Sequence, residues 1–189
     1  MSAQDSKLFV ISGPSGAGKG TLVALLRERH PGLGLTVSAT TRAPRKGEVD
    51  GVNYFFLTRE EFDRRVANGE FVEWAEVHGN CYGTLVSEVQ SKLASGSSLI
   101  LEIDVQGALQ VKERFPEAVL IFIKPPSLEV LRERLVGRGT ETPETIELRM
   151  ANAADELALA DRYDDVVVND DLDRATDELV RVLDMHERI

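Results

Sequence analysis

The sequence has little cysteine, no long apolar run and fewer basic than acidic residues, and each shortage excludes a class of protein. Cys81 is the only cysteine, so no disulfide can form within the chain. The longest apolar runs, such as residues 118–123, have the length of a strand and are too short to cross a bilayer. Lys and Arg number 22 against 32 Asp and Glu, a net charge of −10, which disfavours binding to nucleic acid or to an anionic membrane.

Two further features are missing. The first seven residues are polar and mixed, without a basic start and an apolar core, so we expect no signal peptide and a cytoplasmic location. The three histidines, His30, His78 and His186, show no metal-ligand spacing, so we expect no zinc site.

The 189 residues, 42% hydrophobic and 29% charged, suit one compact globular domain with or without a small insert. The sequence does not indicate an oligomeric state.

Apolar runs of strand length alternate with helical patterns over much of the chain. Strands are predicted at residues 7–12, 98–104, 118–124 and 165–169, and helices at residues 21–29, 105–114, 128–136 and 171–185. Strands that are apolar on both faces are typical of a parallel sheet covered by helices on each side. The pattern predicts an α/β fold with a mostly parallel sheet.

Two segments interrupt this alternation. Residues 37–87 contain short strand-like pieces and one helix, whose start at Thr58 fits a capping box with Glu61, and they predict an inserted lobe. Residues 131–155 are charged and helical, with a helix start at Thr142 and Pro143, and predict a mobile lid. We therefore expect a core made of residues 1–36, 88–130 and 156–189, a lobe at 37–87 and a lid at 131–155.

A glycine-rich loop follows the first predicted strand and precedes a helix. It comprises Gly13, Pro14, Ser15, Gly16, Ala17, Gly18, Lys19, Gly20 and Thr21. In such a P-loop the backbone N–H groups converge on phosphate oxygens, the helix N-terminus adds positive potential, and the lysine reaches the outer phosphates. This context favours ATP or GTP binding over a plain glycine-rich turn. Gly20 stands where a Ser or Thr normally binds Mg²⁺, and Thr21 comes one residue later.

A pair of arginines stands out in this acidic chain. Arg42 and Arg45 offer two guanidinium groups that suit bidentate contacts to a phosphate, and Tyr54 adds a neutral hydroxyl donor. Taken alone, two exposed arginines paired with Glu48 or Asp50 would be the commoner explanation. Downstream of a P-loop, the phosphate clamp is favoured.

These motifs together carry a family resemblance. Residues 40–56 match T-T-R-x-x-R-x-x-E-x-x-G-x-x-Y-x-F, and residues 71–74 and 78–84 match F-x-E-W and H-G-N-x-Y-G-[ST]. The chain thereby resembles the guanylate kinase family over nearly its whole length, which implies a P-loop NTPase core with a small mixed α/β GMP-binding lobe and a helical lid. The resemblance implies GMP contacts from Ser38, Arg42, Arg45, Glu48, Tyr54, Glu73, Tyr82, Gly83, Thr84, Asp104 and Arg149.

Glu73 suits recognition of guanine. A carboxylate can accept hydrogen bonds from both N1–H and the 2-amino group of guanine, whereas adenine has no donor at either position. Without its neighbours, Glu73 would equally be a surface acid on a strand. Its neighbour Trp74 is expected in the core rather than against a ligand.

Acids end the strand predicted at 98–104, and arginines fill the lid. Glu102 and Asp104 lie two residues apart and so share one face, where magnesium bound to ATP would lie near them and Thr21. Capping of the next helix remains an equal explanation for Glu102. The resemblance implies that Arg134, Arg138 and Arg149 reach ATP phosphates and that Asn169 lies beside adenine, although Arg134 and Arg138 also have the spacing of a solvated helix face.

The sequence thus predicts an enzyme that moves the γ-phosphoryl group of ATP to GMP or dGMP with Mg²⁺, and its small-molecule substrates are its expected partners. The predicted catalytic residues are Lys19, Arg42, Arg138 and Arg149, and residues 13–21, Arg134, Arg138 and Asn169 are predicted to bind ATP. A non-catalytic binding module related to these kinases would typically lack Lys19. A kinase for another acceptor would lack the set of Arg42, Arg45, Tyr54 and Glu73.

Overall fold

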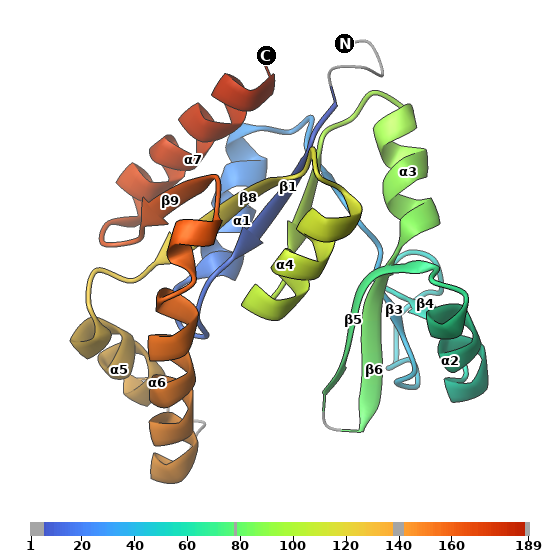
Figure 1. The fold of residues 1–189 in the computed structure, drawn as a ribbon, viewed down its shortest axis with the longest axis horizontal. Helices are drawn as coiled ribbons and strands as arrows, with labels where there is room; N and C mark the ends of the chain where they lie inside the picture. The colour runs from blue at the N-terminus through green and yellow to red at the C-terminus, as the bar shows by residue number, and fades with distance from the viewer. Residues whose placement is uncertain (1–5, 78, 138–141, 188–189) are drawn as a thin grey trace.

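A computed structural model describes residues 6–77, 79–137 and 142–187. Its larger sheet has five parallel strands in the order β2 (Gly34–Leu35), β7 (Leu99–Glu102), β1 (Leu8–Ser12), β8 (Val119–Lys124) and β9 (Asp165–Val168). All five strands therefore direct their carboxyl ends to one edge of the sheet, as Figure 1 shows for β1, β8 and β9. In open parallel sheets this edge is where ligands bind.

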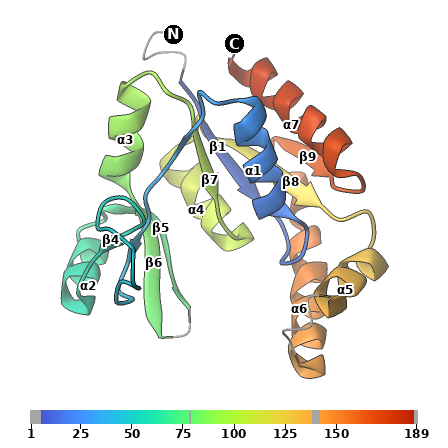
Figure 2. The same ribbon diagram turned by 180° about the vertical axis from the view of Figure 1, so that it is seen from behind.

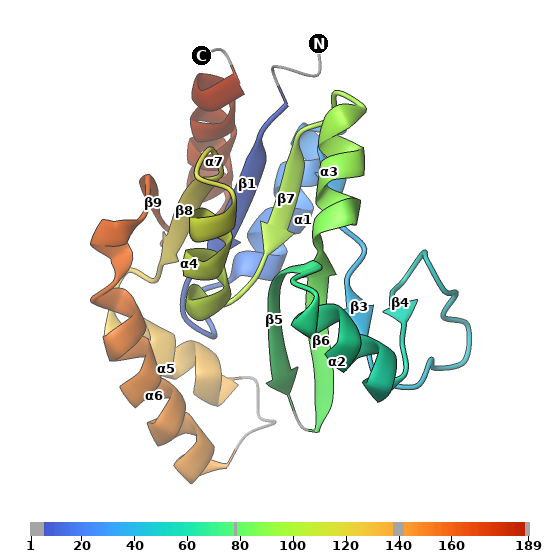
Figure 3. The same ribbon diagram turned by 45° about the vertical axis from the view of Figure 1, so that its right-hand side comes forward.

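Helices cover both faces of this sheet. α1 (Lys19–Arg29) and α7 (Leu172–Glu187) pack on the face to which Phe9 and Ile11 point. α3 (Val86–Ala94) and α4 (Val105–Arg114) pack on the other face, with Val10, and Figure 3 shows them in front of the sheet with α1 behind. Alternate residues of β1 thus enter opposite halves of the core, which explains why the strand is apolar throughout.

The inserted lobe is built on a second sheet. Its strands have the order β4 (Phe55–Phe56), β3 (Ala39–Thr40), β6 (Asn80–Leu85) and β5 (Phe71–Val77), with β5 and β6 antiparallel. Helix α2 (Arg59–Ala67) packs against this sheet through Phe62, whose ring stacks on that of Phe71.

Two helices make up the segment predicted as a lid, and a short 3₁₀ turn returns the chain to the sheet. α5 (Leu128–Gly137) and α6 (Pro143–Leu157) share a small apolar cluster, and the turn spans Ala160–Arg162. Lid and lobe both project from the carboxyl edge of the parallel sheet, on opposite sides of it (Figure 1). A bound ligand at this edge would therefore lie between them.

Most of the predicted helices and strands are confirmed, with ends that agree to within about two residues. The predicted α/β fold class is also confirmed. Thr58 caps α2 by accepting a hydrogen bond from the N–H of Glu61, and Thr142 caps α6 in the same way with Thr145. The sequence analysis missed β2, β6 and α3. Within the described residues, no helix combines the length and the apolar composition needed to span a membrane.

Candidate active site

The glycine-rich loop connects β1 to the amino end of α1. Gly13, Gly16 and Gly18 all have positive φ angles, of 142°, 91° and 92°, which only glycine adopts without strain. Gly18 forms the N-cap of α1, no side chain caps that helix end, and its first turn holds no acidic residue. The positive end of the helix is thus left open to an anion.

Lys19 lies over the loop that precedes it. Its Nζ donates hydrogen bonds to the carbonyl oxygens of Gly13 (2.6 Å) and Pro14 (3.1 Å). A pocket of about 260 Å³ opens here and is lined by Ser15, Gly16, Gly18, Lys19, Gly20, Thr21 and Glu102. The structure therefore brings Thr21 and Glu102 to one pocket, as the sequence predicted for residues near a metal.

Glu102 faces the loop and does not cap the following helix. A Cβ atom on Gly20 would lie 3.6 Å from Glu102 Oε1, so the glycine leaves space beside this carboxylate. Burial raises the pKa of Glu102, and the charge of Lys19 opposes that shift. Asp104 is the helix cap, since it accepts a hydrogen bond of 2.7 Å from the N–H of Gly107.

The lid and β9 contact the loop directly. Arg149 on α6 donates a hydrogen bond to Ser15 Oγ. Arg134 on α5 donates to the carbonyl oxygens of Asn169 (2.8 Å) and Ala17 (3.4 Å), and Asn169 Nδ2 donates to Ala17 O at 2.7 Å. Arg134 is thus half-buried against the loop rather than on a solvated face, and Arg138 lies outside the described residues.

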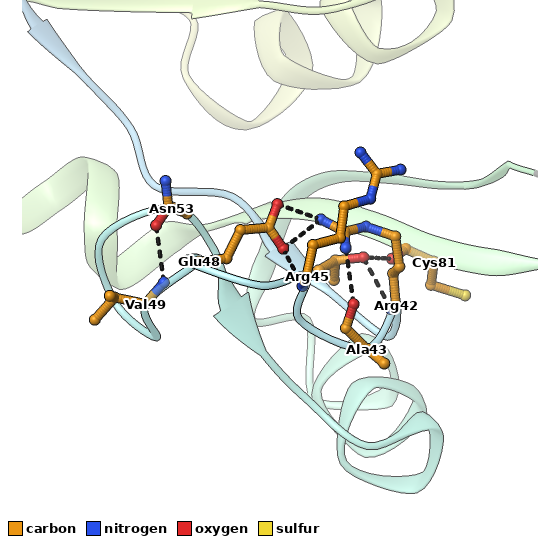
Figure 4. Close-up of polar contacts among 8 residues, drawn as sticks. Arg42, Ala43, Arg45, Glu48, Val49, Asn53 and Cys81 are labelled. Atoms are coloured by element: carbon orange, nitrogen blue, oxygen red, sulfur yellow. Dashed lines mark hydrogen bonds and ion pairs between the residues drawn. The ribbon is translucent and has the colours of Figure 1, made fainter.

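In the lobe, an ion pair holds the first arginine of the predicted clamp (Figure 4). Arg42 Nη2 contacts both carboxylate oxygens of Glu48, at 2.8 and 3.0 Å, and Arg42 Nη1 donates to Ala43 O at 2.7 Å. Glu48 also accepts a hydrogen bond of 2.7 Å from the backbone N–H of Arg45. The hydrogen bond to Arg42 lowers the pKa of Glu48, so this carboxylate stays charged and fixes the turn between the arginines.

The rest of the clamp surrounds this pair. The guanidinium of Arg45 extends away from Glu48 (Figure 4), and that of Arg42 lies 5.4 Å from the ring centre of Tyr54. The Tyr54 and Tyr82 rings lie 6.2 Å apart, edge to face. Ser38 precedes β3 and accepts a backbone hydrogen bond from Phe55. The guanidinium of Arg42 thus lies beside Tyr54, and Tyr82 lies next to Tyr54.

Glu73 lies on β5 opposite Thr84 on β6. Burial raises the pKa of Glu73, the contact with Thr84 offsets part of that shift, and the charge of Asp104 raises the pKa further. Gly83 has a packing role here, because a Cβ on it would lie only 2.7 Å from Glu73 O and 2.8 Å from Phe71. This glycine lets β5 and β6 approach each other behind the Glu73 side chain.

The lobe meets the core at the amino end of α4. Glu73 Oε2 lies 3.6 Å, and Asp104 Oδ1 3.4 Å, from the position that a Cβ on Gly107 would take. Asp104 follows Glu102 by two residues of extended chain, a span of about 7 Å. The Glu73 carboxylate and the phosphate-loop pocket therefore lie at two ends of the same short segment of the sheet edge.

Comparison with known proteins decides the family. The family model "Guanylate kinase" matches residues 5–186, nearly the whole chain. The chain belongs to the guanylate kinase family.

Close relatives within the guanylate kinase family share half or more of the sequence. The chain is 58% identical to the guanylate kinase of Gloeobacter violaceus over 178 residues, 94% of this chain and 87% of the relative. It is 52% identical to that of Halalkalibacterium halodurans over 183 residues, 97% and 90% of the two chains. The crystal structure of guanylate kinase from Anaplasma phagocytophilum superposes with a TM-score of 0.72 at 37% identity and covers 96% of this chain and 86% of that one.

One acid near this candidate site was missed by the sequence analysis. Burial raises the pKa of Glu156, with a lowering contribution from Lys19 and a raising one from Asp104, so Glu156 lies near both. It follows Arg149 by seven residues on α6 and so shares its helix face. The seven-residue spacing from Arg149 is the feature of the sequence that could have pointed to Glu156. The expectation for Trp74 was wrong, because 41% of its surface is exposed.

Proposed function

We propose that this chain catalyses transfer of the γ-phosphoryl group of ATP to GMP or dGMP, giving ADP and GDP or dGDP. The observation that carries the proposal is the arrangement along the sheet edge. Glu73, which suits guanine, lies beside Asp104, while Glu102, two residues earlier, lines the phosphate-loop pocket. A guanine pocket and a triphosphate pocket at this separation suit an acceptor and a donor that meet phosphate to phosphate.

On the donor side, ATP binds at the glycine-rich loop. The backbone N–H groups of the loop and the start of α1 hold its phosphates, and Lys19 turns from the carbonyls of Gly13 and Pro14 toward them. Adenine lies near Asn169, which already contacts Ala17. The proposed ATP-binding residues are residues 13–21, Arg134, Arg138 and Asn169.

On the acceptor side, Arg42 and Arg45 bind the GMP phosphate with Tyr54 and Tyr82. Glu48 acts as a positioning residue, because it fixes Arg42 and the Arg45 backbone. Glu73 accepts from guanine N1–H and the 2-amino group, and its raised pKa reflects a buried carboxyl that these two donors would satisfy. Ser38, Thr84 and Asp104 line the base, Gly83 allows the strand approach, and Arg149 reaches the GMP phosphate from the lid.

Catalysis consists of positioning and charge stabilisation. A GMP phosphate oxygen attacks the γ-phosphorus of ATP in line, the bond to the β-phosphate oxygen breaks, and ADP leaves, so no side chain acts as nucleophile. Lys19, Arg42, Arg138 and Arg149 surround the phosphoryl group and offset its charge. The lid and lobe exclude water, which would otherwise hydrolyse ATP.

The oxygen-donor set beside the loop fits a magnesium ion. Glu102, Thr21 and Asp104 offer hard oxygen ligands, and a nearby cation would favour the charged form of Glu102, whose pKa is raised by burial. With Gly20 after Lys19, these residues would hold the ion largely through water. When bound with ATP, Mg²⁺ offsets negative charge on the phosphate oxygens.

The remaining assignments follow from this proposal. The core (1–36, 88–130, 156–189) carries ATP, the lobe (37–87) carries GMP, and the lid (131–155) closes over both. ATP and GMP are its partners, and the net charge of −10 disfavours nucleic acid. We place the enzyme in the cytoplasm, where both nucleotides are made and used.

A coupled assay of ADP formation with GMP, dGMP, AMP, CMP and UMP at equal concentration tests the proposal. GMP should be strongly preferred, because the other bases leave Glu73 without its two donors. Glu73→Gln should lower kcat/KM for GMP by about 10- to 100-fold and leave the affinity for ATP unchanged. Comparable turnover of AMP by the wild-type enzyme would contradict the proposal.

A further inference from the structure

A histidine and two acids meet at the end of the molecule opposite the active site. α1 and α7 pack side by side and run in the same direction, so their carboxyl ends lie together (Figure 2). His30 is the C-cap residue of α1, and Asp184 and Glu187 lie in the last turns of α7. His30 is more than 150 positions from the two acids in the chain, which is why the sequence gave no sign of a shared site.

The ligand atoms lie close enough together for one metal ion to join them. His30 Nε2 lies 3.2 Å from Asp184 Oδ1, and one ligand atom from each of His30, Asp184 and Glu187 lies within 4.8 Å of the others. Two ligands of a tetrahedral zinc ion with bonds of about 2.05 Å are about 3.3 Å apart. All three residues are half-buried and so remain open to an ion from solution.

The local electrostatics favour a cation. Both helices direct the negative ends of their dipoles to this point. Arg29, the nearest guanidinium on α1, is paired with Asp173 (2.8 Å) and Asp177, which lie about three and two turns before Asp184 on α7. Its positive charge is thus held away from the carboxylates of Asp184 and Glu187.

We propose that His30, Asp184 and Glu187 bind one divalent transition-metal ion of the zinc class, through an imidazole nitrogen and two carboxylate oxygens, with water as a fourth ligand. Imidazole with carboxylates suits Zn²⁺ and Co²⁺, whereas Mg²⁺ prefers six oxygen ligands, so the magnesium that accompanies ATP would not compete. The ion would join the carboxyl ends of α1 and α7. The 11 residues of α1 separate it from Lys19 by about 16 Å, so it is distinct from the active site.

Titration of tag-free protein, without nucleotide, tests the proposal. Calorimetry should show one Zn²⁺ per chain with a Kd on the order of micromolar, and Co²⁺ should give visible absorption bands of low coordination number. His30→Asn and Glu187→Gln should each weaken binding at least about tenfold, since each removes one of three ligands. His186→Asn is the matched control, because His186 lies on the same helix but pairs with Asp165 at 2.8 Å.

Thermal unfolding gives an independent readout. Zn²⁺ should raise Tm of the wild type and of His186→Asn and should leave Tm of His30→Asn and Glu187→Gln unchanged, because an ion that binds only the folded protein stabilises it. Excess Mg²⁺ should not displace Zn²⁺. The proposal is overturned if no ion binds at millimolar Zn²⁺, or if both ligand variants bind it as tightly as the wild type.

Discussion

The carboxylate of Glu73, on the lobe strand β5, lies 3.6 Å from the point where a Cβ on Gly107 would stand in the core helix α4. Asp104 Oδ1 lies 3.4 Å from the same point. The missing side chain at position 107 thus leaves space beside both carboxylates. This contact joins the lobe to the sheet edge and sets where guanine would lie relative to the phosphate loop.

Gly107→Ala should weaken GMP selectively. The added methyl would lie 3.3 Å from Ile103 Cδ1 and close to both carboxylates, so it should displace Glu73 and raise KM for GMP several-fold, with KM for ATP unchanged. The variant should be at least as stable as the wild type, because alanine is more favourable than glycine within a helix by about 1 kcal/mol. Gly32→Ala, with nothing within 4 Å of its Cβ, is the control for steady-state kinetics. An unchanged KM for GMP would mean that guanine does not bind beside Glu73 and Gly107.

Glu73→Gln should stabilise the protein increasingly as pH rises. The pKa of Glu73 in the folded chain is raised above its ordinary value of 4.5, so its contribution to stability is complete below that value and is lost as pH rises through the folded pKa. Glutamine does not titrate. Urea unfolding from below pH 4.5 to neutral pH should therefore show the free energy of unfolding of the variant rising relative to that of the wild type.

Glu61→Gln provides the control of opposite sign. Arg64 and Arg65 lower the pKa of Glu61, so its carboxylate stabilises the fold above the ordinary value, and that contribution disappears as pH falls through the folded pKa. This variant should lose stability relative to the wild type toward neutral pH. If both variants changed in the same direction, the assigned cause of the Glu73 shift would be wrong.

Glu48→Gln should raise KM for GMP by about tenfold with a smaller change in kcat, because a neutral amide holds Arg42 and the Arg45 N–H less firmly than a carboxylate. KM for ATP should not change. Glu61→Gln, on helix α2 of the same lobe, should leave KM for GMP and kcat unchanged. A loss confined to kcat would mean that Glu48 has a role other than positioning the clamp.

Arg149→Met should lower kcat by about 100-fold or more, because it removes a donor from the phosphoryl group while the lid still folds on its apolar cluster. Arg132→Met is matched to it, since Arg132 pairs with Glu147 between the same two lid helices on their exposed side. Single-turnover kinetics should show near wild-type rates for Arg132→Met. Equal losses in the two variants would indicate a structural effect on the lid.

The sequence predicted the core well where the signal is an apolar run or a helix-capping motif. The apolar runs that became β1, β8 and β9 and the caps at Thr58 and Thr142 are local features, so a single segment carries enough information to place them. β2 was missed because two residues form no periodic pattern, and its pairing with β7 is a tertiary contact. α3 follows directly on β6, and no break in the sequence separates the two.

The roles within the site were harder to assign, because they depend on what each side chain meets. Asp104 rather than Glu102 caps α4, although the two acids share one strand face in the sequence. Glu48 holds Arg42 and the Arg45 backbone, a contact that the sequence analysis had weighed as a simple surface pair. Glu156 is remote in sequence from Lys19, and only the placement of α6 brings it near.

The central claim is that the GMP pocket and the ATP loop are two ends of one cleft, and a bisubstrate compound tests it most directly. Adenosine and guanosine joined through a pentaphosphate should bind with one molecule per chain in a calorimetric titration, and binding should be abolished by prior saturation with either ATP or GMP. Simultaneous binding of the compound with a full equivalent of GMP, or of ATP, would contradict the claim.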